Sequence, residues 1–556
     1  MRRLSMVLVL ALAAAVWPAV GAAAHAGTAA SVAAGSLEAD FNNDGFADLA
    51  IGVPFEDIGA VEGAGAVNLL YGAAGGLGAA GNQQFWQGAS GVAGTAEQGD
   101  GFGFALAAGD FNNDGFADLA VGVPFEDIGA TQAAGAVNVL YGAAGGLTGA
   151  GSQLFRQGAG GVGGSAEGQD EFGRALSAGD FNNDGFADLA VGVPFEDIGA
   201  IAQAGAVNVL YGGAGGLSGT GSQAFWQAAG GVAGQLGDFD RFGWALSSGD
   251  FNNDGFADLA VGVPGDSGGA IEGAGAVNVL YGAAGGLTGS GSQLLGQDSG
   301  GVVGTAESGD DFGSALAAGD FDNDGFADLA VGVSFEAIGA TQGAGAVNVL
   351  YGAAGGLTGA GSQLFWQGAG GVAGIAEDFD QFGFALAAGD FNDNGFADLA
   401  IAAPFEDVGG TQGAGAVNVL YGGAAGGLSA GGNQQFWQGA GGVAGVAEDF
   451  DVFGFALSAG DFNDNGSADL AVGVPFEDIG AIAEAGAVNV LYGGAAGGLS
   501  AGGNQQFWQG AGGVAGVAED FDAFGWALVG SDQPNGSTAA SSSSQAKTPD
   551  GTFLDR

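Results

Sequence analysis

One string of residues recurs along this chain at a fixed interval, and it restricts the folds that the chain can adopt. The string is DFNNDGFADLA, with small variations in the later copies. The interval is 70 residues, with one step of 71. Self-similarity at a fixed period indicates one structural unit repeated as an array or a ring. Seven copies begin at Asp40, Asp110, Asp180, Asp250, Asp320, Asp390 and Asp461.

Each period contains four short apolar segments. In the unit that begins at Phe102 they are FGFALAAGD, DLAVGVP, GAVNVLYG and SQLFRQ, separated by clusters of Gly, Asp, Asn and Pro. Such segments are typical of β-strands joined by turns, and no long run with a helical period occurs. Four strands in each of seven units predict an all-β, seven-bladed β-propeller of four-stranded blades. A parallel β-helix is the competing fold, but its GGxGxDxUx repeat is absent.

The two ends of the array predict how the ring closes. An FGxAL segment precedes the second to seventh copies of the string but not the first, and an extra FGWAL begins at Phe524. The strand Phe524–Leu528 is therefore expected to complete the first blade and to close the ring without a covalent bond. An open solenoid with ragged ends is the alternative.

The sequence outside the repeats predicts how the chain is processed. Residues 1–26 have a charged start, an apolar core and an Ala-His-Ala cleavage site, which are typical of a secretory signal peptide. The apolar run is too short to span a membrane, and we expect no transmembrane segment. Residues 27–532 are predicted to form the propeller, and 533–556 a disordered low-complexity tail. The predicted location is secreted, extracellular or periplasmic.

The charge and the rare residues exclude several functions. The chain has 61 acidic residues against 7 Lys and Arg and a net charge of −54, which repels nucleic acids. It has no Cys, and its one His lies inside the predicted signal peptide. Disulfides, cysteine zinc sites and Ser-His or Cys-His catalysis are therefore excluded from the mature chain. We predict no enzyme, although hydrolysis by a pair of carboxylates would need neither residue type.

The recurring string itself has the pattern of a calcium loop. Oxygen-bearing side chains stand at positions 1, 3, 5 and 9, a Gly at position 6 permits a sharp turn, and position 7 can offer a backbone carbonyl. Hard Ca²⁺ prefers such all-oxygen ligands. An EF-hand would need Glu at position 12, where the first copy has Ile51. An Asx-rich turn without a metal is the alternative.

Up to seven Ca²⁺ ions are predicted, one for each loop. Loop five has a fourth carboxylate, Asp322, and is expected to bind most tightly, whereas loops six and seven have only two carboxylates among the ligand positions and are expected to bind most weakly. The predicted ligands are Asp40, Asn42, Asp44, Phe46, Asp48, Asp110, Asn112, Asp114, Phe116, Asp118, Asp180, Asn182, Asp184, Phe186, Asp188, Asp250, Asn252, Asp254, Phe256, Asp258, Asp320, Asp322, Asp324, Phe326, Asp328, Asp390, Asn392, Asn394, Phe396, Asp398, Asp461, Asn463, Asn465, Ser467 and Asp469.

The order FGxAL, calcium-type loop, Gly-Val-Pro resembles the FG-GAP repeat of the integrin α-chain β-propeller and its bacterial secreted relatives. The resemblance covers about residues 36–532 and rests on motifs such as Phe102-Gly103 and Gly122–Pro124. It implies calcium in the loop between the first two strands of each blade. It also implies ligand binding on the opposite face, where the PFEDIGA loops would lie. Their acidic residues are Glu56, Asp57, Glu126, Asp127, Glu196, Asp197, Glu406, Asp407, Glu477 and Asp478.

The resemblance implies a secreted calcium-binding propeller that acts as a cell-adhesion or ligand-binding module. We expect a monomer that binds a protein or glycan, of basic character if the acidic face docks it, and no nucleic acid. Two alternatives stay open: the propeller of a carboxylate-only hydrolase or lyase, and a structural component of an extracellular matrix or surface layer. The acidic surface can also serve solubility alone.

Overall fold

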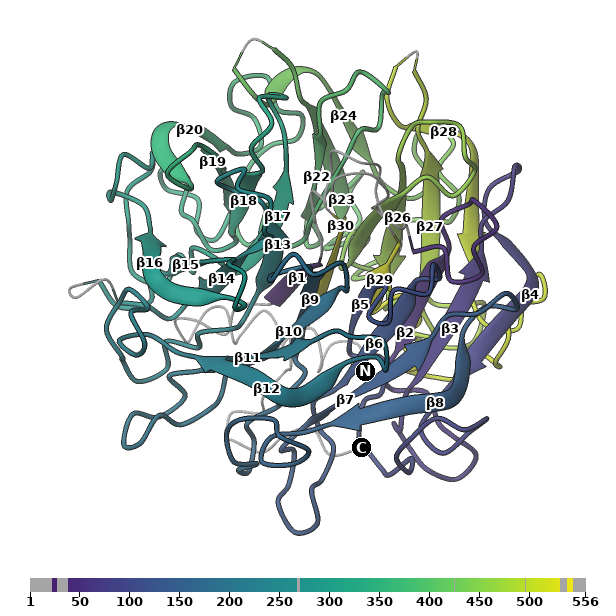
Figure 1. The fold of residues 1–556 in the computed structure, drawn as a ribbon. Coiled ribbons are helices and arrows are strands. Elements are labelled where there is room, and N and C mark those ends of the chain that lie inside the picture. Colours follow the sequence, from purple (N-terminus) through teal and green to yellow (C-terminus); the bar gives the residue numbers. More distant parts are fainter. Residues whose placement is uncertain are drawn as a thin grey trace.

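A ring of small antiparallel sheets surrounds a central axis in this protein (Figure 1). The structure, a computed structural model, describes residues 23–27, 39–267, 271–424, 426–495, 497–530 and 538–543. Within these residues there are thirty strands and no helix, and twenty-eight of the strands form seven four-stranded blades. The predicted all-β, seven-bladed propeller is confirmed.

The first blade combines strands from both ends of the array, and the other six follow the chain from the axis outwards. The first blade contains β29 (Ala527–Val529), β2 (Leu49–Val53), β3 (Ala66–Tyr71) and β4 (Gly78–Phe85). The second blade contains β5 (Ala105–Gly109), β6 (Asp118–Val123), β7 (Ala136–Tyr141) and β8 (Thr148–Phe155), and the third contains β9 (Ala175–Gly179), β10 (Asp188–Val193), β11 (Ala206–Tyr211) and β12 (Ser218–Phe225). The fourth contains β13 (Leu246–Gly249), β14 (Asp258–Val263), β15 (Ala276–Tyr281) and β16 (Thr288–Leu295), and the fifth contains β17 (Ala315–Gly319), β18 (Asp328–Val333), β19 (Ala346–Tyr351) and β20 (Thr358–Phe365). The sixth contains β21 (Leu386–Gly389), β22 (Asp398–Ala403), β23 (Ala416–Tyr421) and β24 (Ser429–Phe436), and the seventh contains β25 (Leu457–Gly460), β26 (Asp469–Val474), β27 (Ala487–Tyr492) and β28 (Ser500–Phe507).

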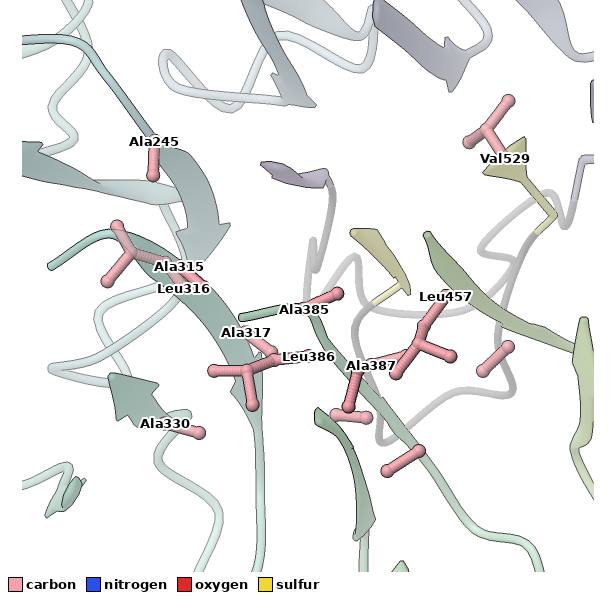
Figure 2. Close-up of a cluster of buried hydrophobic side chains, with 14 of the residues drawn as sticks. Ala245, Ala315, Leu316, Ala317, Ala330, Ala385, Leu386, Ala387, Leu457 and Val529 are labelled. Atoms are coloured by element: carbon pink, nitrogen blue, oxygen red, sulfur yellow. The ribbon is translucent and has the colours of Figure 1, made fainter. Parts of the chain in front are cut away.

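Small side chains let the innermost strands converge on the axis. These strands have sequences such as ALAAG and ALSAG and are almost entirely buried, and each contacts the innermost strands of both neighbouring blades. Figure 2 shows Leu386 of β21 beside Ala317 of β17, and Leu457 of β25 beside Ala387 of β21. Larger side chains at the alanine positions would separate the strands, because buried interiors are close-packed.

The middle strands of each blade are hydrophobic on both faces. The second strand, DLAVGV in most blades, is buried along its whole length, and the third, AVNVLY, is buried up to its Tyr. Both faces pack against neighbouring blades, and this explains why the hydrophobic run is continuous rather than alternating. The outermost strand, such as β8, faces solvent over part of its length and contains Gly, Thr, Ser and Gln.

The C-terminal end of the array closes the ring. β29 pairs antiparallel with β2, with Leu528 opposite Ile51, and the Gly525 amide donates to the Gly52 carbonyl at 3.2 Å. The predicted closure is confirmed, but the bounds of the predicted strand, Phe524–Leu528, were wrong. Residues 524–526 form the turn that enters the strand, and the Gly of the Phe-Gly pair lies in a turn in every blade.

Two further strands lie at the centre of the ring. β1 (Ala23–Gly27) pairs with β30 (Thr538–Ser543), and β30 pairs with β25 where Leu457 lies opposite Ala540. Figure 1 shows both strands near the axis, and together they extend the seventh blade to six strands. β30 lies within the predicted disordered tail, 533–556, so this part of it has regular structure. The rest of that tail, and residues 1–22 of the predicted signal peptide, lie outside the described residues.

Candidate metal centres

The seven predicted calcium loops lie on one face of the propeller. In six blades the loop connects the innermost strand to the second strand, as residues 110–117 connect β5 to β6, and in the first blade the loop directly precedes the second strand, β2. Because the innermost strands of all blades run in the same direction, their ends meet at one face. The structure thus brings the seven loops together on this face, and the PFEDIGA turns and the connections between blades lie on the other.

Position 1 of each loop organises the turn through hydrogen bonds to the loop's own backbone. Asp40 accepts hydrogen bonds from the Asp44 amide at 3.0 Å and from the Gly45 amide at 2.7 Å. The equivalent Asp does the same in the other six loops. Asn43 and Gly45 have positive φ angles of 54° and 91°, which Asn and Gly tolerate best. The DxNxDG pattern therefore specifies the turn itself.

Position 9 carries a buried carboxylate at the start of the second strand. Asp48 is fully buried, and its two oxygens accept hydrogen bonds from the amides of Phe41 and Gly72, both at 2.9 Å. Burial raises its pKa to about 8, and the nearby Asp40 and Asp44 carboxylates add to this rise. Burial raises the pKa of the position-9 Asp to about 8 in every other loop as well. A bound cation would favour the charged form of these groups.

Position 3 provides side-chain oxygens that have no hydrogen-bond partner in four loops. The Oδ1 atoms of Asn42, Asn112, Asn252 and Asp322 are buried and unpaired. A buried polar atom without a partner is costly, unless a ligand satisfies it. Carbonyl and carboxylate oxygens of this kind are the donors that Ca²⁺ prefers, so these residues fit the predicted ion.

Loop five brings three carboxylates together. Oxygens of Asp320, Asp322 and Asp328 all lie within 4.8 Å of one another, and no other set of three acidic groups in the described part of the chain is this close. In loops one to four, position 3 is Asn, and the third carboxylate stands instead at position 5. Loop five therefore has the most compact cluster of negative charge, at the loop predicted to bind most tightly.

Positions 5 and 7 are linked to each other in the structure. Oδ1 of Asp44 accepts a hydrogen bond from the Phe46 amide at 3.2 Å, and the same contact occurs in the other loops. In loops six and seven, the Nδ2 groups of Asn394 and Asn465 donate to the carbonyls of Gly422 and Gly493. In those loops the position-3 amides, Asn392 and Asn463, donate to the position-9 carboxylates at 2.8 Å. The same contact is longer, 3.3 Å, in loops two and three.

The Phe-Gly and Gly-Val-Pro motifs that flank the loops contact each other between neighbouring blades. A Cβ placed on Gly52, in the Gly-Val-Pro of the first blade, would lie 2.0 Å from the carbonyl oxygen of Gly103, in the Phe-Gly of the second. Gly103 has a φ of 95°, and a Cβ there would lie 2.5 Å from the Ala66 carbonyl. Its amide donates to the Gly122 carbonyl of its own blade. The Phe-Gly motif of one blade and the Gly-Val-Pro motif of the preceding blade thus form one close backbone contact.

Comparison with known protein families gives the same segments. The FG-GAP repeat model matches residues 32–70, 102–140, 172–210, 242–280, 312–350, 382–420 and 453–491. The chain belongs to the FG-GAP repeat family. Each matched segment contains a calcium-type loop, the second strand of one blade and all but the last residue of the third.

Curated relatives of this FG-GAP protein include phospholipases D and integrin α-chains. Rat phosphatidylinositol-glycan-specific phospholipase D is 36% identical over 174 residues, which is 31% of this chain and 20% of the relative. Mouse integrin alpha-E is 45% identical over 95 residues (16% and 8%), and Xenopus laevis integrin alpha-5 is 31% identical over 237 residues (42% and 20%). The matched regions span a fifth or less of each relative's own length.

Solved structures share only a distant likeness with the FG-GAP propeller. The Dos1 propeller covers 86% of this chain, and 88% of its own chain is matched, at 10% identity and a TM-score of 0.36. Bacillus licheniformis rhamnogalacturonan lyase PL11 covers 93% and 90%, at 11% identity and a TM-score of 0.35. No functional conclusion follows from similarities of this size. No helix in the described residues is long and apolar enough to cross a membrane.

The resemblance placed the glutamates of the PFEDIGA turns on an acidic face opposite the predicted calcium loops. The structure instead shows that these side chains are largely shielded from solvent. Glu56 and Glu477 are buried, and Glu126 and Glu196 are half-buried. Each accepts a hydrogen bond from a Gln of the preceding blade, as Gln438 Nε2 donates to Glu477 Oε2 at 2.9 Å. These hydrogen bonds place the Glu side chains at the contacts between blades. The neighbouring Asp57, Asp127, Asp197 and Asp407 are exposed, and Asp478 is half-buried.

The sequence analysis missed these glutamines, although a signal was present. A Gln follows the outermost strand at the same place in every FG-GAP unit: Gln87, Gln157, Gln227, Gln297, Gln367, Gln438 and Gln509. All seven are buried. Gln87 also donates to Asn138 Oδ1 of the next blade at 3.2 Å. A polar residue kept in every unit beside a strand indicates a buried hydrogen bond between units.

The centre of this face also differs from the repeat pattern. The residue after each Phe-Gly pair changes from blade to blade and includes Phe104, Arg174 and Trp244. The Arg174 guanidinium lies 4.9 Å from the centre of the Trp244 ring, 5.3 Å from that of Phe104, and 2.5 Å from Glu171 Oε2. Seven identical large side chains could not all occupy one axis, so the blades differ there.

Proposed function

We propose that this FG-GAP propeller is secreted, binds calcium in its seven loops and acts as a ligand-binding or cell-adhesion module. The observation that carries the calcium proposal is the set of unpaired oxygens at position 3, Asn42, Asn112, Asn252 and Asp322, beside buried carboxylates. The converging Asp320, Asp322 and Asp328 support it further. Within the described residues, no Lys or Arg lies in these loops to neutralise them.

The side chains at positions 1, 3, 5 and 9 would hold the ion. Calcium would supply the positive charge that these mutually repelling carboxylates lack. The residues themselves are already oriented: the position-1 Asp is fixed by two backbone amides, and the position-9 Asp by two others. Because this orientation is built into the fold, binding would order few additional groups.

The ligand-binding part of the proposal rests on the relatives named integrin and on the opposite face. The exposed Asp residues of the PFEDIGA turns, together with the acidic connections between blades, make that face negative. We propose a monomer with a protein or glycan partner, located outside the cell.

An enzymatic role is the weaker proposal. A carboxylate-only hydrolase would need an accessible pair of acidic groups. Asp380 and Glu406 are in contact, and burial raises the pKa of Asp380 to about 6 and that of Glu406 to about 8. The Asp380 charge adds to the rise at Glu406, whereas the hydrogen bond with Glu406 lowers the pKa of Asp380. Both residues are buried at a contact between blades. Among the relatives, the phospholipases D match over only a fifth of their length, so their activity is not transferred to this chain.

Calcium titration and thermal unfolding test the proposal. We expect calorimetry to detect several calcium ions bound, and excess EDTA to lower the melting temperature by at least about 5 °C. Binding of the protein to cell or matrix surfaces should weaken in EDTA. No heat of calcium binding, together with an unchanged melting temperature in EDTA, would overturn the calcium proposal.

A further inference from the structure

Three consecutive connections between blades expose an aliphatic side chain at the same place. Ile375, Val446 and Val517 have 70%, 68% and 69% of their surface exposed. They lie between the outermost strand of one blade and the innermost strand of the next, from the fifth blade round to the first. This places all three on the face opposite the calcium loops. We call them the aliphatic row.

The other four units carry polar residues at this position. They are Thr95, Ser165, Gln235 and Thr305. Burial therefore does not require an aliphatic residue here, and the fold accepts a hydroxyl or an amide at the same place. Three neighbouring β-branched aliphatic residues exposed at about 70% are costly unless something covers them.

A strained Phe accompanies each member of the aliphatic row. Phe379, Phe450 and Phe521 follow four residues later, with φ angles of 69°, 68° and 74°. In the other four connections the same place holds Gly99, Gln169, Phe239 and Gly309, all with positive φ angles. The positive φ is therefore common to all seven connections, and the row is distinguished by having both an exposed aliphatic residue and a Phe in each connection. The Phe379 ring lies against Gly343, where an added Cβ would be 2.9 Å from it, and remains partly exposed.

Acidic residues separate the aliphatic row from these rings. An exposed acidic pair follows each aliphatic residue in all three connections: Glu377-Asp378, Glu448-Asp449 and Glu519-Asp520. Asp378 is held in place, because its Oδ1 accepts a hydrogen bond from the Gln342 amide at 2.9 Å. The basic residues of the described chain, Arg156, Arg174 and Arg241, all precede these blades. This part of the face therefore combines exposed apolar side chains with negative charge.

We propose that the aliphatic row and its acidic pairs dock a polypeptide segment of a partner protein that alternates basic and apolar side chains. Apolar groups of the segment would cover Ile375, Val446 and Val517, while its Lys or Arg side chains would face the acidic pairs. An anionic membrane or nucleic acid would be repelled by the same charges. This inference rests on the proposed ligand-binding function and assigns it a location and a partner chemistry.

Binding of synthetic peptides to the full chain in calcium tests this inference. The probes are a peptide alternating Lys and Leu, one alternating Lys and Ser, and one alternating Glu and Leu. We expect the Lys-Leu peptide to bind most tightly and more weakly in high salt, and the Glu-Leu peptide not to bind. Substituting the row as I375T/V446T/V517T should weaken binding of the Lys-Leu peptide by at least about tenfold. Equal affinity of this variant and the unchanged chain would overturn the proposal.

Two matched variants make the result specific. Val303 is exposed but lies outside the row, so Val303→Thr should leave the affinity unchanged. Thr305→Val adds a fourth member to the row and should tighten binding. Failure of both expectations would show that the peptide binds elsewhere, and would overturn the proposal.

The proposed function can fail separately. If the triple variant binds calcium and adheres to surfaces as well as the unchanged chain does, the docking surface is wrong and the proposed function stands. If the Lys-Leu peptide binds the unchanged chain but not the triple variant, and EDTA changes nothing, the docking surface stands and calcium dependence is wrong.

Discussion

At the scale of single residues, position 3 sets the difference in acidic residues between loop five and loops one to four. Asp322 is the one acidic residue at this position, and its oxygen is buried and unpaired like those of Asn42, Asn112 and Asn252. Replacing the Asp322 carboxylate with an amide therefore tests the difference between loop five and loops one to four, because the surrounding hydrogen bonds are kept.

Asp322→Asn should weaken the tightest calcium site by about tenfold, because ligand charge tunes affinity. The reciprocal change, Asn42→Asp, should tighten a site in the first loop. Terbium luminescence or calorimetry would measure both, and the melting temperature without calcium should change little. The ranking of the loops is wrong if the two substitutions leave the binding curve unchanged.

The Gly of the Phe-Gly motif is constrained from two sides. Gly103 has a φ of 95°, and a Cβ would clash with the Ala66 carbonyl. We predict that Gly103→Ala lowers the free energy of unfolding by at least about 2 kcal/mol. Gly75→Ala is the control, because nothing lies within 4 Å of a Cβ there and its φ is not positive. Thermal unfolding of both variants would decide, and equal melting temperatures would show that the contact is not tight.

At the scale of elements, blades are joined by buried Gln–Glu hydrogen bonds. Glu477 is representative: Gln438 donates a hydrogen bond to it, while Glu448 and Asp478 repel its charge. Burial raises its pKa to about 7, against 4.5 for an exposed Glu. The folded state therefore binds a proton that the unfolded state releases between these two values. The contribution of Glu477 to stability is lost as the pH rises from about 4.5 to about 7.

Glu477→Gln removes this titration and keeps an acceptor oxygen for Gln438. We predict that the variant gains about 1–2 kcal/mol at pH 8 relative to pH 5, compared with the unchanged chain. Denaturant unfolding at both pH values, in EDTA, measures this difference. Glu62→Gln, at an exposed position, should show no such gain. A variant with the same pH dependence as the unchanged chain would show that Glu477 is charged throughout this range.

Much of the element scale could be predicted from sequence, because the repeat shows each unit seven times. Turn residues and apolar runs predicted four strands in each blade, and the loops on one face followed from the strand order. The burial of Glu56 could not be predicted in this way. Its partner, Gln509, is in the last unit, 453 residues away, and a Pro-Phe-Glu-Asp turn is polar enough to suggest exposure. The pairing of β1 with β30 was also missed, since neither segment has a strand-like apolar pattern.

The sequence predicted which residues form the candidate calcium site more fully than how their oxygen atoms are arranged. The spacing identified positions 1, 3 and 9, which the structure brings together in loop five. It also assigned position 5, where Asp44 accepts a hydrogen bond from the Phe46 amide. Spacing alone does not say which oxygens a backbone amide already occupies, so position 5 stays a prediction.

At the scale of the whole molecule, one short strand closes the ring. β29 makes three residue pairs with β2, and Leu528 is buried opposite Ile51. We predict that Leu528→Asp opens the ring, because an unpaired charge would be buried in the first blade. The melting temperature should fall and limited proteolysis should cut near both ends of the propeller. Leu294→Asp, at a partly exposed position, is the control and should be tolerated. Equal protease resistance of the two variants would show that closure depends on more than this pair.

The first blade also stays incomplete during most of the synthesis of the chain. β2, β3 and β4 leave the ribosome early, but their fourth strand is made only when residue 527 is reached. At about 5–20 residues per second, this delay is roughly half a minute to a minute and a half. During it, the open edge of β2 can pair with any other strand, including one from a neighbouring nascent chain. A chaperone or a slow export step that shields this one edge would therefore raise the yield of folded protein more than help given to any later blade.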